Sequence, residues 1–123
     1  MNDKVATLLA AGQCVRVVPS RVKAGQVEAW VAAHRVHHTP VVRRQPGFVA
    51  KVLMQAETDP QCVAMLLVWE SSEQALAWTK RPEHDTSSAP VGAFVDRSGG
   101  RVEAAPRGGY RILEVVTERG GAE

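Results

Sequence analysis

A chain of 123 residues is long enough for one domain of ordinary size and too short for two. Its net charge of +2, without a long run of lysine and arginine, argues against a nucleic-acid-binding protein. Its apolar stretches are too short to span a membrane or to act as a secretion signal, so we expect a cytoplasmic protein without membrane contact.

The first predicted elements are a short helix and a strand. Apolar residues at helical spacing before Gly12 predict an N-terminal helical extension over residues 1–12. The valine-rich segment 13–18 is typical of a strand. Pro19 is expected to end that strand, because proline cannot donate a hydrogen bond to a neighbouring strand.

A longer amphipathic helix is predicted over residues 23–38. Apolar and histidine side chains share one face of it at about 100° per residue, and these are Val27, Trp30, Val31, His34 and His38. Pro40 disfavours helical geometry at the residue before it, but Thr39 could instead cap one further turn. The segment Gln-Pro-Gly at 45–47 predicts a tight turn.

Two strands are predicted to follow as a hairpin, over residues 48–57 and 62–69, with a turn at 58–60. The second strand is apolar at every position, without the alternation of a half-buried strand. Such a strand must be covered on both faces, and a chain of this length can supply helices for one face only. A second copy of the chain is therefore expected to cover the other face.

The last predicted elements are two helical segments and a strand. Ser71 and Gln74 have the spacing of a capping box at the start of a helix. A looser helical region over residues 81–94 follows, and a glycine-rich connection comes after it. The strand 110–117 closes the domain, and we expect a flexible tail over residues 118–123.

The predicted element order is strand, helix, strand, strand, helix, strand. Two split βαβ units in this order give a ferredoxin-like α+β sandwich, with helices on one face of an antiparallel sheet. We therefore predict one such domain over residues 13–117. Two copies would pack their sheets face to face at about 10 Å and form a dimeric α/β barrel.

His34 and His38 are the strongest candidates for catalysis. They lie four residues apart on the apolar face, whereas His37 points about 80° away from it. An imidazole that faces an apolar pocket could accept a proton from a phenolic substrate. Two other interpretations stay open here. The pair could be buried histidines bonded to backbone or water, or a divalent-metal site, whose third ligand no HExxH motif supplies.

Three further residues could line the same pocket. Trp69 and Trp78 could stack on a planar ligand or serve only as core residues. His84 could face the pocket, or it could interact with the C-terminal end of the preceding helix, where a cation is favoured. No histidine or aspartate is spaced to activate Cys14 or Cys62, so we expect both to be unreactive thiols.

Three segments carry a resemblance to a known family. They are Gln-Pro-Gly-Phe at 45–48, Leu-Val-Trp-Glu-Ser-Ser-Glu-Gln-Ala-Leu-Ala-Trp at 67–78, and Pro-Glu-His at 82–84. Together they resemble the antibiotic biosynthesis monooxygenase (ABM) domain of the dimeric α/β-barrel superfamily, over residues 13–117. The resemblance implies a homodimer with a pocket between sheet and helices in each subunit. Some members of the family oxidise polycyclic quinols without metal or flavin, and others bind and degrade haem.

The resemblance can be followed residue by residue. Trp69 stands where the quinol-oxidising members have the tryptophan that ends the third strand. Met65 stands where those enzymes have the asparagine that holds the substrate. Trp78 matches a helix tryptophan of the haem-degrading members, whose haem-ligating histidine lies further along the chain than His84.

We predict an ABM-type monooxygenase that acts on a small planar aromatic or quinone-like substrate without a dedicated cofactor or metal. Its predicted catalytic residues are His34 and His38. The predicted substrate-binding residues are Trp30, Met65, Trp69, Trp78 and His84. The alternative functions are a non-catalytic dimeric protein that binds a small aromatic ligand, or a family member that binds or degrades haem.

Overall fold

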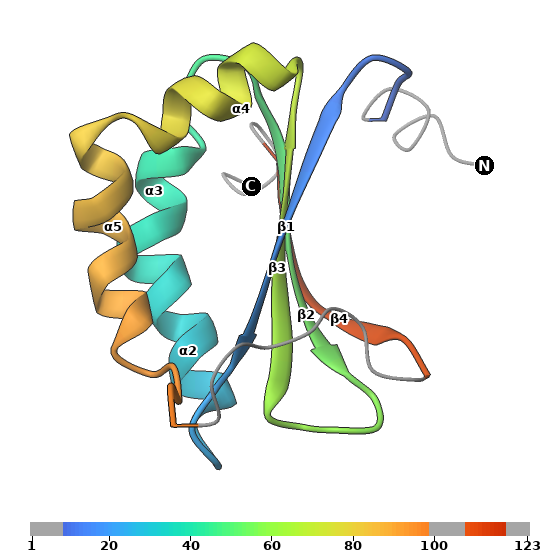
Figure 1. Cartoon of the computed structure of the whole chain (residues 1–123), viewed down its shortest axis with the longest axis vertical. Coiled ribbons are helices and arrows are strands. Elements are labelled where there is room, and N and C mark those ends of the chain that lie inside the picture. The colour runs from blue at the N-terminus through green and yellow to red at the C-terminus, as the bar shows by residue number, and fades with distance from the viewer. Residues whose placement is uncertain (1–8, 99–107, 118–123) are drawn as a thin grey trace.

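Residues 9–98 and 108–117 are described by this computed structural model, which has a helical layer and a sheet layer (Figure 1). In chain order, the elements are β1 (Cys14–Arg21), α2 (Val27–Ala33), the π-helix η1 (His34–His38), α3 (Thr39–Val42), β2 (Phe48–Ala56), β3 (Cys62–Trp69), α4 (Ser72–Thr79), α5 (Pro82–Gly92) and β4 (Tyr110–Thr117). The strands form one antiparallel sheet in the order β1-β3-β2-β4. This arrangement confirms the predicted ferredoxin-like fold. The predicted helix at 1–12 lies largely outside the described residues, and the predicted tail at 118–123 lies entirely outside them.

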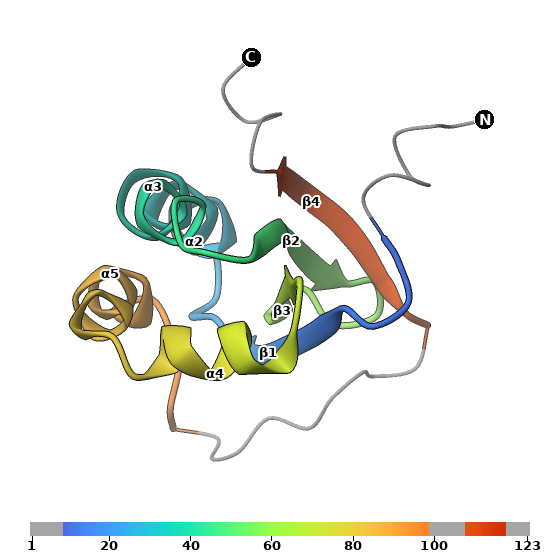
Figure 2. The same ribbon diagram turned by 90° about the horizontal axis from the view of Figure 1, so that it is seen from above.

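The described helices all lie on one face of the sheet (Figures 1 and 2). α2, η1 and α3 follow one another in a row beside α5, and α4 lies near β1 and β3. None of these helices is long and apolar enough to cross a membrane. Over the other face of the sheet, the described part of the chain places no helix.

The face without helices exposes apolar side chains. About half or more of the surface of four of them is accessible, and these are Val15, Val17, Ile112 and Val115. On β3, Ala64 and Val68 are buried on this face by neighbouring side chains, whereas Leu66 is only partly buried. The sheet around the apolar strand β3 therefore has an apolar face that no described residues cover.

Two apolar clusters fill the space between the helices and the sheet. The cluster at one end contains Val22, Trp30, Ala33, Leu53, Val63 and Val91. The cluster at the other end contains Val42, Phe48, Leu67, Trp69, Ala75 and Trp78. Met65 packs against both clusters and so lies at the centre of the helix-facing side of the sheet. These clusters hold the helical row at a fixed distance above β2 and β3.

The prediction that Pro19 ends the first strand is wrong. β1 continues through Pro19 to Arg21, and Pro19 is paired with Ala64 of β3. β1 is an edge strand with one neighbour, so the missing N–H of a proline costs no hydrogen bond on the open side. The strand is therefore longer than the segment 13–18 that the valine content indicates.

The predicted helix over residues 23–38 also differs from the structure. The helical row begins at Val27, widens into the π-helix η1 at His34–His38 and continues as α3 to Val42. The backbone N–H of Thr39 bonds to the carbonyl of His34, five residues earlier, which is the π-helical pattern. Pro40 is accommodated in the first turn of α3, a position that proline tolerates in helices.

The turn before β2 packs against the N-terminal end of α4. Gly47 has a positive φ of 85°, and a Cβ atom at this position would collide with the side chain of Gln74. The hydroxyl of Ser71 accepts a hydrogen bond from the Gln74 backbone N–H at 3.2 Å and donates to Gln74 Oε1 at 3.2 Å. The predicted helix cap is thus confirmed, and it packs against the glycine of the predicted turn.

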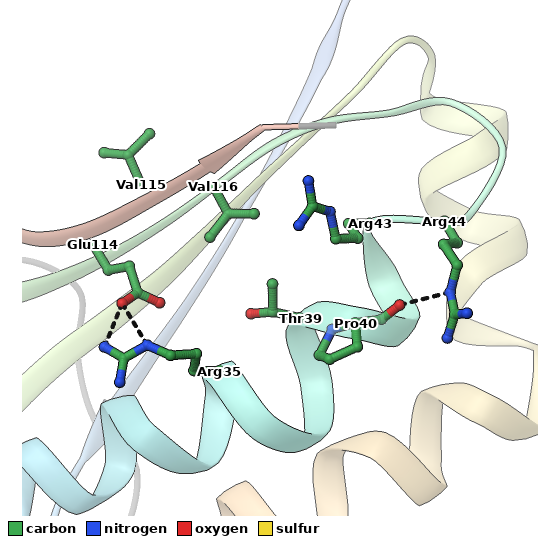
Figure 3. Close-up of a pocket in the computed structure, with 8 residues that line it drawn as sticks. All are labelled: Arg35, Thr39, Pro40, Arg43, Arg44, Glu114, Val115 and Val116. Carbon is green, nitrogen blue, oxygen red and sulfur yellow. Dashed lines mark hydrogen bonds and ion pairs between the residues drawn. The ribbon is translucent and has the colours of Figure 1, made fainter. Parts of the chain in front are cut away.

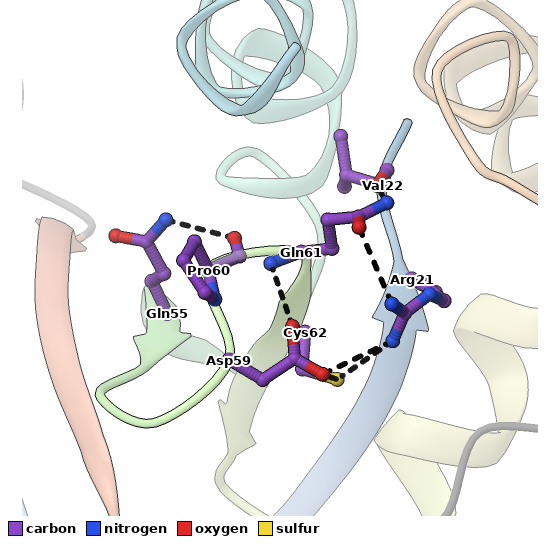
Figure 4. Close-up of polar contacts among 7 residues, drawn as sticks. All are labelled: Arg21, Val22, Gln55, Asp59, Pro60, Gln61 and Cys62. Atoms are coloured by element: carbon purple, nitrogen blue, oxygen red, sulfur yellow. Dashed lines mark hydrogen bonds and ion pairs between the residues drawn. The ribbon is translucent and has the colours of Figure 1, made fainter. Parts of the chain in front are cut away.

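Polar contacts tie the β2–β3 hairpin to the end of β1 (Figure 4). Arg21 pairs with Asp59 at 3.1 Å and donates to Gln61 at 3.3 Å, and the Cys62 thiol donates to Asp59 at 3.3 Å. These hydrogen bonds from Cys62 and Arg21 lower the pKa of Asp59, while burial and the Asp59 charge raise the pKa of the thiol. Both cysteines are free and half-buried. A raised thiol pKa makes Cys62 a poor nucleophile, so we assign this cluster to hairpin stability.

Candidate active site

The π-helix η1 turns two histidines towards the sheet. His34 is 3% exposed and His38 is 2% exposed, whereas His37 faces solvent. A π-helical turn holds one more residue than an α-helical turn, and such turns occur frequently at functional sites. The predicted orientation of these three histidines is therefore confirmed.

The predicted aromatic residues form a continuous row of ring contacts. The ring centroids of Trp30 and His34 are 4.6 Å apart, and those of His34 and His38 are 5.3 Å apart. His38 then contacts Trp78 at 6.1 Å, and Trp78 contacts both His84 at 5.4 Å and Trp69 at 6.3 Å. The structure thus brings these side chains together in the interior. Their role in binding substrate stays a prediction.

Lys51 is a member of this site that the sequence analysis did not select. It lies on β2 with its side chain fully buried beneath the helical row. Its Nζ atom lies 2.7 Å from His38 Nδ1 and donates to Thr39 Oγ1 at 2.8 Å. The strand and the π-helix therefore meet at a buried contact between an amine, an imidazole and a hydroxyl group.

Burial changes the protonation of all three ionisable groups in the site. Desolvation lowers the pKa of Lys51 to about 7, and the charge of Glu114 partly opposes that effect. Desolvation, followed by the charge of Lys51, lowers the pKa of His38 to about 3 and that of His34 to about 2. Both histidines are therefore neutral at pH 7. Because Lys51 donates towards His38 Nδ1, we assign the ring proton of His38 to Nε2.

Two buried polar atoms in the row find no hydrogen-bond partner among the described residues. They are His34 Nδ1 and Trp69 Nε1. A buried donor or acceptor without a partner costs about 1–3 kcal/mol, so native structures contain few of them. Their presence at a cluster with altered pKa values is typical of a functional site.

An open cavity lies between α3 and β4, next to the buried contact (Figure 3). Its volume is about 640 Å³, within the range of small-molecule sites. The residues that line it are Arg35, Thr39, Pro40, Arg43, Arg44, Glu114, Val115 and Val116. Thr39 belongs both to this lining and to the contact with Lys51. None of the predicted site residues lines this cavity.

Comparison with known proteins identifies the family. The sequence profile described as Antibiotic biosynthesis monooxygenase (ABM) matches residues 14–89, more than half of the chain. The chain belongs to the antibiotic biosynthesis monooxygenase family. No curated protein sequence matched it.

Two solved structures named as antibiotic biosynthesis monooxygenases share the fold of this ABM-family chain. The protein from Nitrosomonas europaea is 19% identical with a TM-score of 0.57, and the match covers 89% of this chain and 92% of that one. The protein from Chloroflexus aurantiacus J-10-fl is 20% identical with a TM-score of 0.54, and the match covers 85% of this chain and 89% of that one. At these identities, the likeness concerns the fold alone.

The geometry of this ABM-family site does not fit haem ligation by His34. His34 is packed between the rings of Trp30 and His38, so an iron atom has no approach to it. His84 is partly exposed, its Nδ1 atom contacts Asp85 at 3.0 Å and its ring lies against Trp78. A carboxylate at one ring nitrogen is compatible with metal ligation by the other nitrogen. Among the described residues, no group of three or more histidine, cysteine, aspartate or glutamate side chains is placed to hold a metal ion.

Proposed function

We propose that this chain is a cofactor-independent oxygenase of a small dihydroxyaromatic compound, and that the buried pair of Lys51 and His38 accepts the substrate proton. The observation that supports this proposal best is the 2.7 Å contact between Lys51 Nζ and the neutral imidazole of His38. A general base works best when its pKa lies near the working pH, and the pKa of Lys51 at about 7 meets that condition. The amine is the stronger base of the pair, and His38 holds it in place.

The proposed reaction needs no group beyond substrate and molecular oxygen. Removal of a phenolic proton makes the ring electron-rich, so that it can pass an electron to oxygen. Recombination at a ring carbon and loss of water then convert the dihydroxyaromatic and one oxygen molecule into a hydroxyquinone and one water molecule. General-base assistance of this kind contributes about 10²–10⁴-fold to the rate.

The substitution His38→Gln is expected to lower oxygen uptake with a reactive hydroquinone by about 10²–10⁴-fold. Glutamine keeps a polar side chain but removes the imidazole that holds the Lys51 amine in place. The matched control is His37→Gln, one residue earlier on the exposed side of the same π-helix, which should leave uptake unchanged. An oxygen electrode and the absorbance of the quinone product measure the rates, with a chelator present throughout.

Equal rates in the wild type and both variants would remove His38 from the mechanism. If the wild-type protein consumes no oxygen with any of a panel of hydroquinones but binds them, the alternative of a non-catalytic aromatic-binding protein is the correct one.

We also propose that two copies of the chain associate through the open face of the sheet. The apolar side chains there are Val15, Val17, Leu66, Ile112 and Val115, and they surround the apolar strand β3. Exposed apolar patches of this kind mark association surfaces in soluble proteins. Sheet-on-sheet packing at about 10 Å would bury them and give a dimeric α/β barrel.

The substitution Val17→Asp should convert the proposed dimer into a monomer, because a carboxylate opposite Leu66 would be buried without a partner. The control Val36→Asp places the same charge on η1, on the helical side of the molecule, where Val36 is 64% exposed. It should leave the dimer intact. Sedimentation velocity at micromolar concentration measures both variants. A wild-type chain that sediments as a folded monomer contradicts the proposed association.

A further inference from the structure

We infer that the cavity between α3 and β4 binds a phenol as its phenolate, and that Thr39 passes the phenol proton to Lys51. The inference rests on the proposed function, because it names the site and the ionised form in which that substrate is held. It also makes a claim about binding that can be measured without any oxidation.

Thr39 forms the route between the cavity and the buried amine. Lys51 is fully buried, so a ligand in the cavity cannot touch it in this structure. Thr39 lines the cavity, and its hydroxyl oxygen lies 2.8 Å from Lys51 Nζ. Val116, which also lines the cavity, is paired with Lys51 across the sheet. A single hydroxyl group therefore separates the cavity from the amine.

The proton of a bound phenol can reach Lys51 through the Thr39 hydroxyl group. When Lys51 is neutral, its lone pair can accept a hydrogen bond from the Thr39 hydroxyl, which reverses the donor role in this contact. A phenol that donates a hydrogen bond to Thr39 Oγ1 can then transfer its proton there while the Thr39 hydroxyl proton moves to the lone pair of Lys51. The products are a phenolate in the cavity and an ammonium group at Lys51, with no change of oxidation state. The titratable and charged groups that face Lys51 are His38 and His34 from η1 and Glu114 from β4.

The cavity wall carries a net positive charge. Three arginines and one glutamate are among its lining residues, so positive charge exceeds negative charge around a bound ligand. Arg35 donates to Glu114 at 2.6 Å, and Arg44 donates to the carbonyl of Pro40 at 2.8 Å (Figure 3). A carbonyl partner leaves the positive charge of Arg44 in place, and such a charge stabilises a phenolate oxygen. Val116 provides apolar contact for the ring, whereas the side chain of Val115 points away from the cavity (Figure 3).

The test uses para-nitrophenol, whose phenolate absorbs visible light and whose neutral form does not. On binding to the wild-type protein, its ionisation midpoint is expected to fall by about one to three pH units. Thr39→Val, which removes the hydroxyl group at nearly constant shape, and Lys51→Met should each remove most of this shift. Thr39→Ser restores the hydroxyl group and should keep the shift.

Two controls locate the probe and separate binding from proton transfer. Arg44→Gln should weaken binding of the phenolate severalfold, whereas Arg81→Gln, an exposed arginine before α5, should not. Para-nitroanisole carries no phenolic proton and should bind the wild type and Thr39→Val equally.

An unchanged ionisation midpoint, or a shift that persists in both Thr39→Val and Lys51→Met, would overturn the inference. A protein that shifts the midpoint but consumes no oxygen with hydroquinones supports the inference and refutes the proposed function. Oxygen consumption without a shift refutes the inference alone.

Discussion

Replacement of Lys51 by methionine is expected to slow oxygen uptake with a reactive hydroquinone by about 10²–10⁴-fold, while the protein stays folded. Methionine retains the length and apolar stem of lysine but has no amine to accept the proton. Removal of a fully buried amine also removes its desolvation cost, so the variant should be at least as stable as the wild type near pH 6. A loss of activity without a loss of stability would show that Lys51 takes part in the reaction.

The pH dependence of stability gives an independent measurement on the same variant. Lys51 has a pKa of about 7 in the folded chain and 10.5 as its ordinary value. Between these values the unfolded chain binds more protons, so the free energy of unfolding of the wild type should rise as the pH increases from about 7 to about 10. Lys51→Met should lose this rise. Urea titrations at several pH values measure it.

His34 and His38 should also make the free energy of unfolding rise with pH, but in a lower pH range. The pKa of His38 is about 3 in the folded chain, and that of His34 is about 2, both below the ordinary 6.5. Their contribution to stability is complete above pH 6.5 and is lost as the pH falls below that value. Lys51→Met should keep this acid-side loss. A wild-type free energy of unfolding that does not change between about pH 5 and about pH 9 would contradict the burial of all three groups.

The substitution Trp69→Ala is expected to lower the free energy of unfolding by about 3–5 kcal/mol. Trp69 is 1% exposed and contacts the rings of Phe48 at 6.1 Å and Trp78 at 6.3 Å. Domains of this size are stable by only about 5–15 kcal/mol, so much of the total would be lost. Equilibrium denaturation in urea, followed by far-ultraviolet circular dichroism, measures the difference.

Trp69→Phe is the matched control for this substitution. Phenylalanine keeps a large aromatic side chain in the cluster and removes the indole N–H, which has no partner among the described residues. The loss of stability should therefore be clearly smaller than that of Trp69→Ala, because a smaller cavity is formed and an unsatisfied donor is removed. Equal losses in the two variants would show that volume at this position is not what stabilises the cluster.

The sheet could be predicted closely from the sequence because its signals are local. β3 and β4 begin and end at the predicted residues, and β2 ends one residue early. Turn residues border each of these strands, and most side chains within the strands are apolar. The first strand was predicted too short because the cost of Pro19 depends on whether its strand lies at the edge of the sheet, which is a property of the whole fold.

The candidate site was predicted only in part, for two physical reasons. The spacing of the apolar residues identifies the helix face that His34 and His38 share. It does not reveal the π-helical hydrogen bonding of this segment. Lys51 was missed because a lysine in a strand is normally solvent-exposed, since burial of an ammonium group is costly. The available signal was its alternation with Leu53 on one side of β2, but the contacts with His38 and Thr39 that offset the cost are tertiary.

The π-helical turn also sets the direction in which the side chains of the following helical residues point. Each residue of a helix rotates the next by about 100°, so one additional residue within His34–His38 changes the direction of all later side chains together. Thr39 at the start of α3 and Arg43 just after its end are four residues apart on one face of the helical row, and both follow this backbone insertion. Substitutions can alter these groups one at a time, whereas a change in the length of this turn would reorient the cavity wall and the buried imidazole in a single step.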